Sequence, residues 1–184
     1  MNFYNELAAQ GITADKIPVV AVSVGEDELT GLDPSKVKGH LAAWNYFQSV
    51  DTPKNKEFVK KFQAKYGKDR VTDDPIAAAY CQVYLWKNAV ELAKSFDVDE
   101  VRKAMLTGNV EFDAPEGKVK ISPKNLHVYK SFRMGKIRGD KQFDIVYETP
   151  PIEPDPYPQV AFPGWSVDHT KGGIKKGAAV KIGS

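Results

Sequence analysis

The stretch FDAPEGKVKISPKNLHVYK, residues 112–130, holds the side chains best suited to acid–base chemistry in this chain of 184 residues. Asp113 and Glu116 lie three positions apart, and a pair of carboxylates can serve as a general acid and a general base. Pro115 lies between them and Gly117 follows, a composition typical of a turn with solvated acids. Because the turn explains both acids, we predict no catalytic role for them.

The three histidines and the single cysteine do not combine into a metal site or a nucleophile. His40, His127 and His169 are far apart in the sequence, and no pair has the spacing of ligands on one helix. Cys81 lies in an apolar helical pattern, where a free cysteine behaves as a small buried hydrophobe. The tripeptide RGD at 138–140 is explained by a polar hairpin turn. We therefore expect no enzyme, no metal and no cofactor.

Another group of residues is suited to holding a small polar solute. Ligands of open α/β sheets bind beyond the carboxyl ends of the strands. Two such ends occur here, SVGE at 23–26 and WNYFQS at 44–49, and they offer a hydroxyl, a carboxylate and two aromatic walls with polar tips. We predict a ligand-binding site formed by Ser23, Val24, Gly25, Glu26, Trp44 and Tyr46. Ordinary strand-end packing is the alternative explanation of these residues.

The strands that must position this site follow from the hydrophobic pattern. An amphipathic helix over 1–11 precedes the run IPVVAVSV, 17–24. This run has no polar alternation, which predicts a strand buried on both faces of a parallel sheet. A short acidic helical turn follows it, and residues 37–47 predict a second strand that ends in aromatic side chains.

Three helices follow the second strand. Pro53, after a capping aspartate or threonine, begins a helix that ends at Gly67. The next helix, over 72–95, is apolar nearly all round, which predicts burial between layers or at an interface. A short amphipathic helix covers 98–106.

From residue 110 the hydrophobic period changes to two. Segments 117–122, 127–137 and 142–148 alternate apolar and polar positions, which predicts an antiparallel meander with one solvated face. Six prolines within 150–163 predict an extended surface strap. The order of elements therefore indicates an α/β protein with an antiparallel appendage.

Composition restricts the partners that we expect. The chain is 42% hydrophobic and 27% charged, as in ordinary globular proteins. Its net charge is +2, and four lysines lie after position 170, so the rest of the chain is no electrostatic binder of nucleic acid. The longest apolar run, 17–24, is too short to insert into a membrane. The N-terminus has no pattern of a signal peptide.

Three blocks of the sequence carry a family likeness. Residues 39–67 (GHLAAWNYFQSVDTPKNKEFVKKFQAKYG), the helical blocks within 73–106, and residues 112–158 resemble the type 1 periplasmic solute-binding proteins of the urea and short-chain amide branch. The likeness covers about residues 1–160. The last block is the most specific, because the DAPEG turn, an asparagine–histidine pair and the proline strap occur there in order.

This resemblance implies a partial periplasmic-binding-protein type 1 fold, with two α/β lobes that close on a small ligand. It divides the chain into the end of one lobe (1–30), an α/β segment of the other lobe (31–108) and the β-meander with its strap (109–163). The tail (164–184) departs from the family pattern, and its composition predicts a flexible basic segment. It also implies that this chain is the C-terminal half of such a protein. We therefore expect self-association, or pairing with the missing N-terminal half, to cover exposed sheet edges.

The resemblance implies capture of urea or a short-chain amide by hydrogen bonds in an interlobe cleft, without catalysis. In the intact protein the partner would be the permease of an ABC transporter, and the location periplasmic or extracellular. An amide-sensing regulatory module of the same fold is the alternative. An amidase would require a nucleophile–base pair that these residues do not form.

Overall fold

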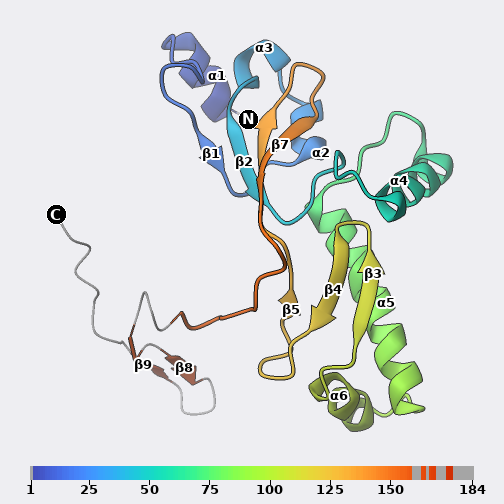
Figure 1. The fold of residues 1–184 in the computed structure, drawn as a ribbon. Helices are drawn as coiled ribbons and strands as arrows, with labels where there is room; N and C mark the ends of the chain where they lie inside the picture. The colour runs from blue at the N-terminus through green and yellow to red at the C-terminus, as the bar shows by residue number, and fades with distance from the viewer. Residues whose placement is uncertain (1, 159–162, 165, 169–172, 176–184) are drawn as a thin grey trace. The chain divides into compact units, whose positions relative to one another are not determined.

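The larger sheet is mixed, and its first two strands are parallel. The computed structural model describes residues 2–158, 163–164, 166–168 and 173–175. Four strands are hydrogen-bonded in the order β1-β2-β6-β7, with bounds Val20–Ala21, Leu41–Trp44, Arg133–Ile137 and Phe143–Glu148. β2 pairs in parallel with β1 and antiparallel with β6, so the hairpin of β6 and β7 joins this sheet from much later in the sequence (Figure 1).

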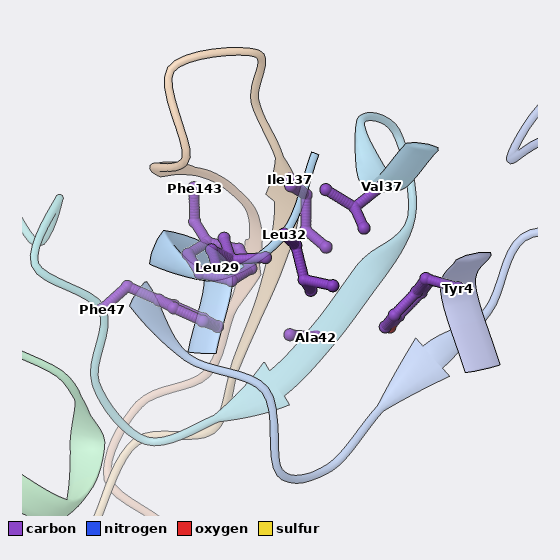
Figure 2. Packing of buried hydrophobic residues seen from close by; sticks show 8 residues of the cluster. All are labelled: Tyr4, Leu29, Leu32, Val37, Ala42, Phe47, Ile137 and Phe143. Carbon is purple, nitrogen blue, oxygen red and sulfur yellow. The ribbon is translucent and has the colours of Figure 1, made fainter. Parts of the chain in front are cut away.

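Three short helices accompany this sheet: α1 (Asn2–Ala9), α2 (Glu26–Thr30) and α3 (Pro34–Val37). Asp33 begins α3 by accepting the backbone N–H of Ser35 at 2.9 Å, with proline at the first helical position. Apolar side chains from these helices, from β2 and from the β6–β7 hairpin form one cluster (Figure 2), made of Tyr4, Leu29, Leu32, Val37, Ala42, Phe47, Ile137 and Phe143.

The second sheet is antiparallel and has three strands, β3 (Glu111–Ala114), β4 (Gly117–Ile121) and β5 (Val128–Tyr129). The long helix α5 (Asp74–Ala93) lies beside it (Figure 1), and α6 (Val98–Leu106) packs on α5. Asp73 caps α5 and Asp97 caps α6, each accepting backbone N–H groups of the first turn. Their shared core consists of Cys81, Leu85, Ala89, Val101, Val110, Ala114, Val119 and Ile121.

Helix α4 (Pro53–Tyr66) packs on the first turns of α5. The Thr52 hydroxyl caps it by accepting the Asn55 N–H at 3.0 Å. A third small core lies here, formed by Tyr46, Val50, Phe58 and Ala77. The helix predictions for 51–67, 72–95 and 98–106 are therefore confirmed in position and type.

Both strands predicted before α4 are shorter than the sequence indicates. Within 17–24 only Val20 and Ala21 pair, and Val20 and Val22 are exposed, so the prediction of burial on both faces is wrong. Among the described residues β1 is an edge strand, and no packed layer covers the side chains of Val20 and Val22. Within 37–47 the strand is limited to Leu41–Trp44, because the cap at Asp33 continues the chain as helix α3 up to Val37.

The predicted meander is divided between two sheets. Segment 127–137 is not one strand: it contains β5, which pairs with β4, and β6, which pairs with β2 and β7. The chain leaves one sheet at Tyr129 and enters the other at Arg133. Helix α5 also differs from its prediction, because Val83 and Trp86 are exposed while only its opposite stripe is buried.

The predicted boundary at residue 30 lies within the described residues, whereas the predicted strap and tail lie partly outside them. The predicted boundary at residue 30 falls between β1 and β2, which share one sheet. The chain separates into units Met1–Glu153 and Pro154–Ser184. In the second unit β8 (Ser166–Asp168) pairs antiparallel with β9 (Gly173–Lys175). His169, residues 159–162 of the predicted strap and most of the basic tail lie outside the described residues.

Candidate functional site

The turn that follows β1 is the part of the predicted site that reaches solvent. Ser23 is exposed, Val24 is half-buried and Gly25 is buried. The Trp44 indole Nε1 donates to the Val24 carbonyl at 3.0 Å, and the Gly25 N–H donates to Glu28 Oε2 at 2.8 Å. These two bonds hold the turn against β2 and the start of α2, so the Ser23 hydroxyl is presented on a fixed backbone.

Glu26 lies beneath this turn and is completely buried. Its Oε1 accepts the Gln48 backbone N–H at 2.6 Å, whereas Oε2 has no hydrogen-bond partner among the described residues. The pKa of the Glu26 carboxyl is raised to about 8, mainly by burial and in part by the nearby charges of Asp73 and Asp74, while the Gln48 hydrogen bond opposes the rise. Glu26 therefore links the start of α2 to the segment that follows β2.

Tyr46 lies in the core and not on a cleft wall. It has no exposed surface, and its hydroxyl is hydrogen-bonded to Asn55 Oδ1 at 2.7 Å and to Thr72 Oγ1 at 2.8 Å. Burial raises the pKa of this phenol. The Asn55 amide in turn donates to the carbonyls of Gln48 and Val50. This network ties segment 45–52 to the first turns of α4 and α5.

The structure thus separates the six predicted residues into two groups. Ser23, Val24, Gly25 and Trp44 meet at one turn, of which the Ser23 side chain is exposed. Glu26 and Tyr46 belong to the buried polar layer below it. Glu26 and Tyr46 hold segment 45–52 in place. The position of a residue at a strand end does not reveal this role, because the role depends on contacts with α4 and α5.

Arg133 is a buried connecting residue that sequence reasoning missed. Its guanidinium is buried and donates to the Asn45 carbonyl, to the Glu116 carbonyl at 2.8 Å and to Glu148 Oε1 at 2.5 Å. It thereby joins β6, the segment after β2, the β3–β4 turn and β7. No local pattern marks Arg133, since its partners lie up to 88 positions away in the sequence.

Glu116 is also buried, which corrects the prediction of a solvated acid. Its carboxylate forms an ion pair with Lys130 Nζ at 2.9 Å, whereas Asp113, on β3 before this turn, is exposed. Burial raises the pKa of Glu116, and the charge of Lys130 opposes that rise. The turn is therefore part of the contact between the two sheets, and His127 lies exposed outside it.

Other hollows lie away from the turn. One of about 770 Å³ is bounded by α4 and segment 48–51, and one of about 570 Å³ lies between α5, α6 and β5. The second is mainly apolar, with Trp86, Met105 and Val128 among its lining residues. Within the described residues, no three histidine, cysteine, aspartate or glutamate side chains gather as metal ligands. None of the described helices has the length and apolarity needed to cross a membrane.

Comparison with known families identifies the fold. The family model described as "Periplasmic binding protein domain" matches residues 1–162. The chain belongs to the periplasmic binding protein domain family. This confirms the expected α/β class and the partial periplasmic-binding-protein fold.

Solved structures resemble this periplasmic binding protein domain. A solute-binding protein of an ABC transporter from Rhodopseudomonas palustris BisB5, in complex with 3,4-dihydroxybenzoic acid, matches with a TM-score of 0.72 and 18% identity over 83% of the chain. The amino acid ABC transporter substrate-binding protein from Pseudomonas fluorescens Pf-5 matches with a TM-score of 0.68 and 25% identity over 84% of the chain. The domain spans 42% of each of those proteins.

A curated enzyme also shares part of this periplasmic binding protein domain. Limonene hydroxylase from Geobacillus stearothermophilus is 32% identical over 111 residues, which are 60% of the chain and 20% of that protein. Because the shared part is a fifth of that protein, we do not transfer its reaction to this chain.

Proposed function

We propose that this chain forms one side of the solute site of a protein that captures urea or a short-chain amide for an ABC transporter. The turn after β1 carries this proposal, because it presents the Ser23 hydroxyl at the carboxyl end of a parallel strand, where ligands of such sheets bind. A hydroxyl can donate to the carbonyl of an amide or accept from its N–H groups.

The charge around the turn favours a neutral ligand. Residues 23–28 include three acids, Glu26, Asp27 and Glu28, and no base. Asp73 approaches the same turn from α5, with its Cβ 3.2 Å from the position that a Cβ on Gly25 would occupy. A ligand carboxylate placed here would be repelled by the exposed acids Asp27 and Glu28, whereas the buried Glu26 is protonated below about pH 8 and adds little charge. An amide offers N–H donors without negative charge.

The same proposal implies a partner and a location for the protein. The ligand-loaded protein would deliver its solute to a permease, and it would work in the periplasm or outside the cell. Membership of the periplasmic binding protein domain family supports this setting. The solute-binding proteins among the solved structures support the role in transport.

Titration of the chain with acetamide, followed by the backbone amide signals of Ser23 and Gly25 in NMR spectra, tests this function. We expect saturable shifts with a dissociation constant on the order of 1–10 mM, since this chain forms only one side of the site. Ser23→Ala should weaken binding about threefold to tenfold through loss of one hydrogen bond. Ser35→Ala is the matched control, since Ser35 is exposed on α3 and bonds only within its own turn.

Benzoate and leucine, titrated under the same conditions, separate amides from other solutes. Tighter binding of either compound at Ser23 would show that the ligand class is wrong. Shifts that appear only outside residues 23–26 would show that the site is elsewhere.

A further inference from the structure

A groove lined by aromatic rings and lysines lies where α4, α5 and β3 meet, and it shares no lining residue with the turn after β1. Its volume is about 440 Å³, within the range of small-molecule sites, roughly 300–1,000 Å³. We call it the aromatic groove. Six rings are among its lining residues: Phe58, Phe62, Tyr66, Tyr80, Tyr84 and Phe112.

The rings of the aromatic groove pack against one another but remain partly exposed. Tyr84 and Phe112 are stacked, with centroids 4.7 Å apart and planes 6° apart. The Tyr80 centroid lies 4.7 Å from those of Phe58 and Tyr84. Of the six rings only Phe58 is buried, and Tyr66 is 57% exposed. Rings that served core packing alone would be covered, so this cluster offers apolar surface to a further ring.

The charge of the groove favours an anion. Three lysines of α4 line it: Lys54, Lys61 and Lys65. Lys61 Nζ pairs with Glu57 at 2.6 Å, whereas Lys65 Nζ lies 5.3 Å from the centroid of the Tyr66 ring. The acids in the lining are Glu57 and Asp113, so three positive charges face two negative ones. The remaining single positive charge suits one carboxylate better than a polyphosphate.

The same lysines show that the groove opens to solvent. The Lys61 side chain is 73% exposed, and Lys54 and Lys65 are exposed as well. A protein layer over this face would remove three ammonium groups from water, which is costly. Val83 and Trp86, which are exposed apolar residues of α5, lie outside the lining. The aromatic groove is therefore bounded by α4, α5 and β3 of this chain, with a charged rim.

We propose that the aromatic groove binds a planar aromatic carboxylate. The ring of the ligand lies against the partly exposed rings, where stacking adds to apolar burial. Its carboxylate lies beside Lys61 and Lys65, whose ammonium groups form charge-assisted hydrogen bonds. The hydroxyls of Tyr80 and Tyr84 supply further donors among the lining residues. This site is separate from the solute site and does not rest on the proposed function.

Three matched compounds test the proposal in NMR titrations of the 184-residue chain, followed at the backbone amides of Phe62, Tyr84 and Phe112. Phenylacetate should cause saturable shifts there, with a dissociation constant on the order of 0.1–1 mM. Phenylacetamide keeps the ring without the charge and should bind at least about fivefold more weakly. Cyclohexylacetate keeps the charge without the aromatic ring and should bind at least about threefold more weakly.

Lys65→Met removes one ammonium group from the rim and should weaken phenylacetate binding by at least about fivefold. Lys60→Met is the matched control, because Lys60 is exposed on the other face of α4 and lines a different hollow. It should change the affinity by less than about twofold. Circular dichroism of both variants verifies that the fold is retained.

Tyr84→Leu removes the ring stacked on Phe112 and should also weaken phenylacetate binding, by at least about threefold. Tyr147→Leu makes the same change at a residue of β7 that is 56% exposed, and it should leave the affinity unchanged within about twofold.

Several results would overturn the proposal. Equal binding of phenylacetate and phenylacetamide would show that no charge is recognised, and equal binding of cyclohexylacetate would show that no ring is recognised. Equal affinity of the two lysine variants would exclude the rim as the anion site. Phenylacetate shifts confined to Ser23 and Gly25 would place the compound in the solute site instead. Acetamide binding is followed at Ser23 and Gly25, so its failure leaves the aromatic groove intact, and failure at the groove leaves the solute site intact.

Discussion

At the residue scale, the most unusual group is the carboxyl of Glu26, which is buried with one oxygen unpartnered among the described residues. An isolated buried charge is costly, so the carboxyl remains protonated to higher pH than in water. Its hydrogen bond from the Gln48 N–H then links α2 to segment 45–52 without a buried charge.

This residue makes stability depend on pH. The pKa of Glu26 is raised from 4.5 to about 8, so between these values the folded chain holds a proton that the unfolded chain releases. The free energy of unfolding should therefore fall as the pH rises through this window, at up to about 1.4 kcal/mol per pH unit, and level off above it. Thermal unfolding between pH 5 and pH 9, roughly the limits set by the two pKa values, measures the slope.

Glu26→Gln should flatten this slope, because an amide of the same shape does not titrate. Asp73 and Asp74 also have raised pKa values, so part of the slope should remain. Asp27→Asn is the control, since Asp27 is the exposed neighbour on α2. An unchanged slope in Glu26→Gln would mean that the carboxyl titrates normally in the folded chain.

At the element scale, the β6–β7 hairpin depends on a close approach at Gly135. A Cβ at this position would lie 2.8 Å from Phe143 Cδ1 and 2.9 Å from Phe47 Cζ. The rings of Phe47 and Phe143 pack against each other with centroids 4.4 Å apart, and both are fully buried. Glycine here allows the two rings to close the core over β6 (Figure 2).

Gly135→Ala should destabilise the chain by about 1–3 kcal/mol, because the added methyl group overpacks a core that cannot expand freely. Guanidinium denaturation measures this change. Gly139→Ala is the control in the following turn, where the nearest atom to an added Cβ is Lys38 Cδ at 3.8 Å. Equal stability of the two variants would contradict the close approach at β6.

At the scale of the whole molecule, Arg133 connects the two sheets. Its guanidinium donates to the carbonyl of Asn45, which follows β2 of the larger sheet, and to the carbonyl of Glu116, in the β3–β4 turn of the second sheet. It also donates to Glu148 on β7. The Lys130–Glu116 ion pair lies beside it and is largely buried. Because water has little access to these groups, removing one cation leaves its buried hydrogen-bond partners unsatisfied.

Arg133→Met should lower the free energy of unfolding by about 3 kcal/mol or more. Arg138→Met should lower it by less than about 1 kcal/mol, since Arg138 forms exposed ion pairs with Asp140 and Asp144. Both variants are compared by guanidinium denaturation. A similar loss in the two would show that Arg133 contributes no more than a surface charge.

The sequence by itself determined the parts that depend on neighbours along the chain. Thr52 with Pro53, and the aspartates at 73 and 97, mark helix starts because a cap acts within three residues. The hairpin turn at 138–140 was predictable from its polar residues. The α/β class was predictable from the order of helical and strand patterns along the chain. The family likeness was also readable from the sequence, and the family match over residues 1–162 confirms it at the level of the fold.

Only the tertiary structure decided which strands share a sheet and which polar groups are buried. Segment 127–137 divides between two sheets because β6 pairs with β2, some ninety positions earlier. Glu26, Glu116 and Arg133 resemble surface residues in the sequence, yet contacts from distant elements bury them. The apolar run at 17–24, by contrast, resembles a buried strand in the sequence but is partly exposed. Its composition indicates a covered strand, but burial depends on what packs against it, and among the described residues only β2 pairs with β1.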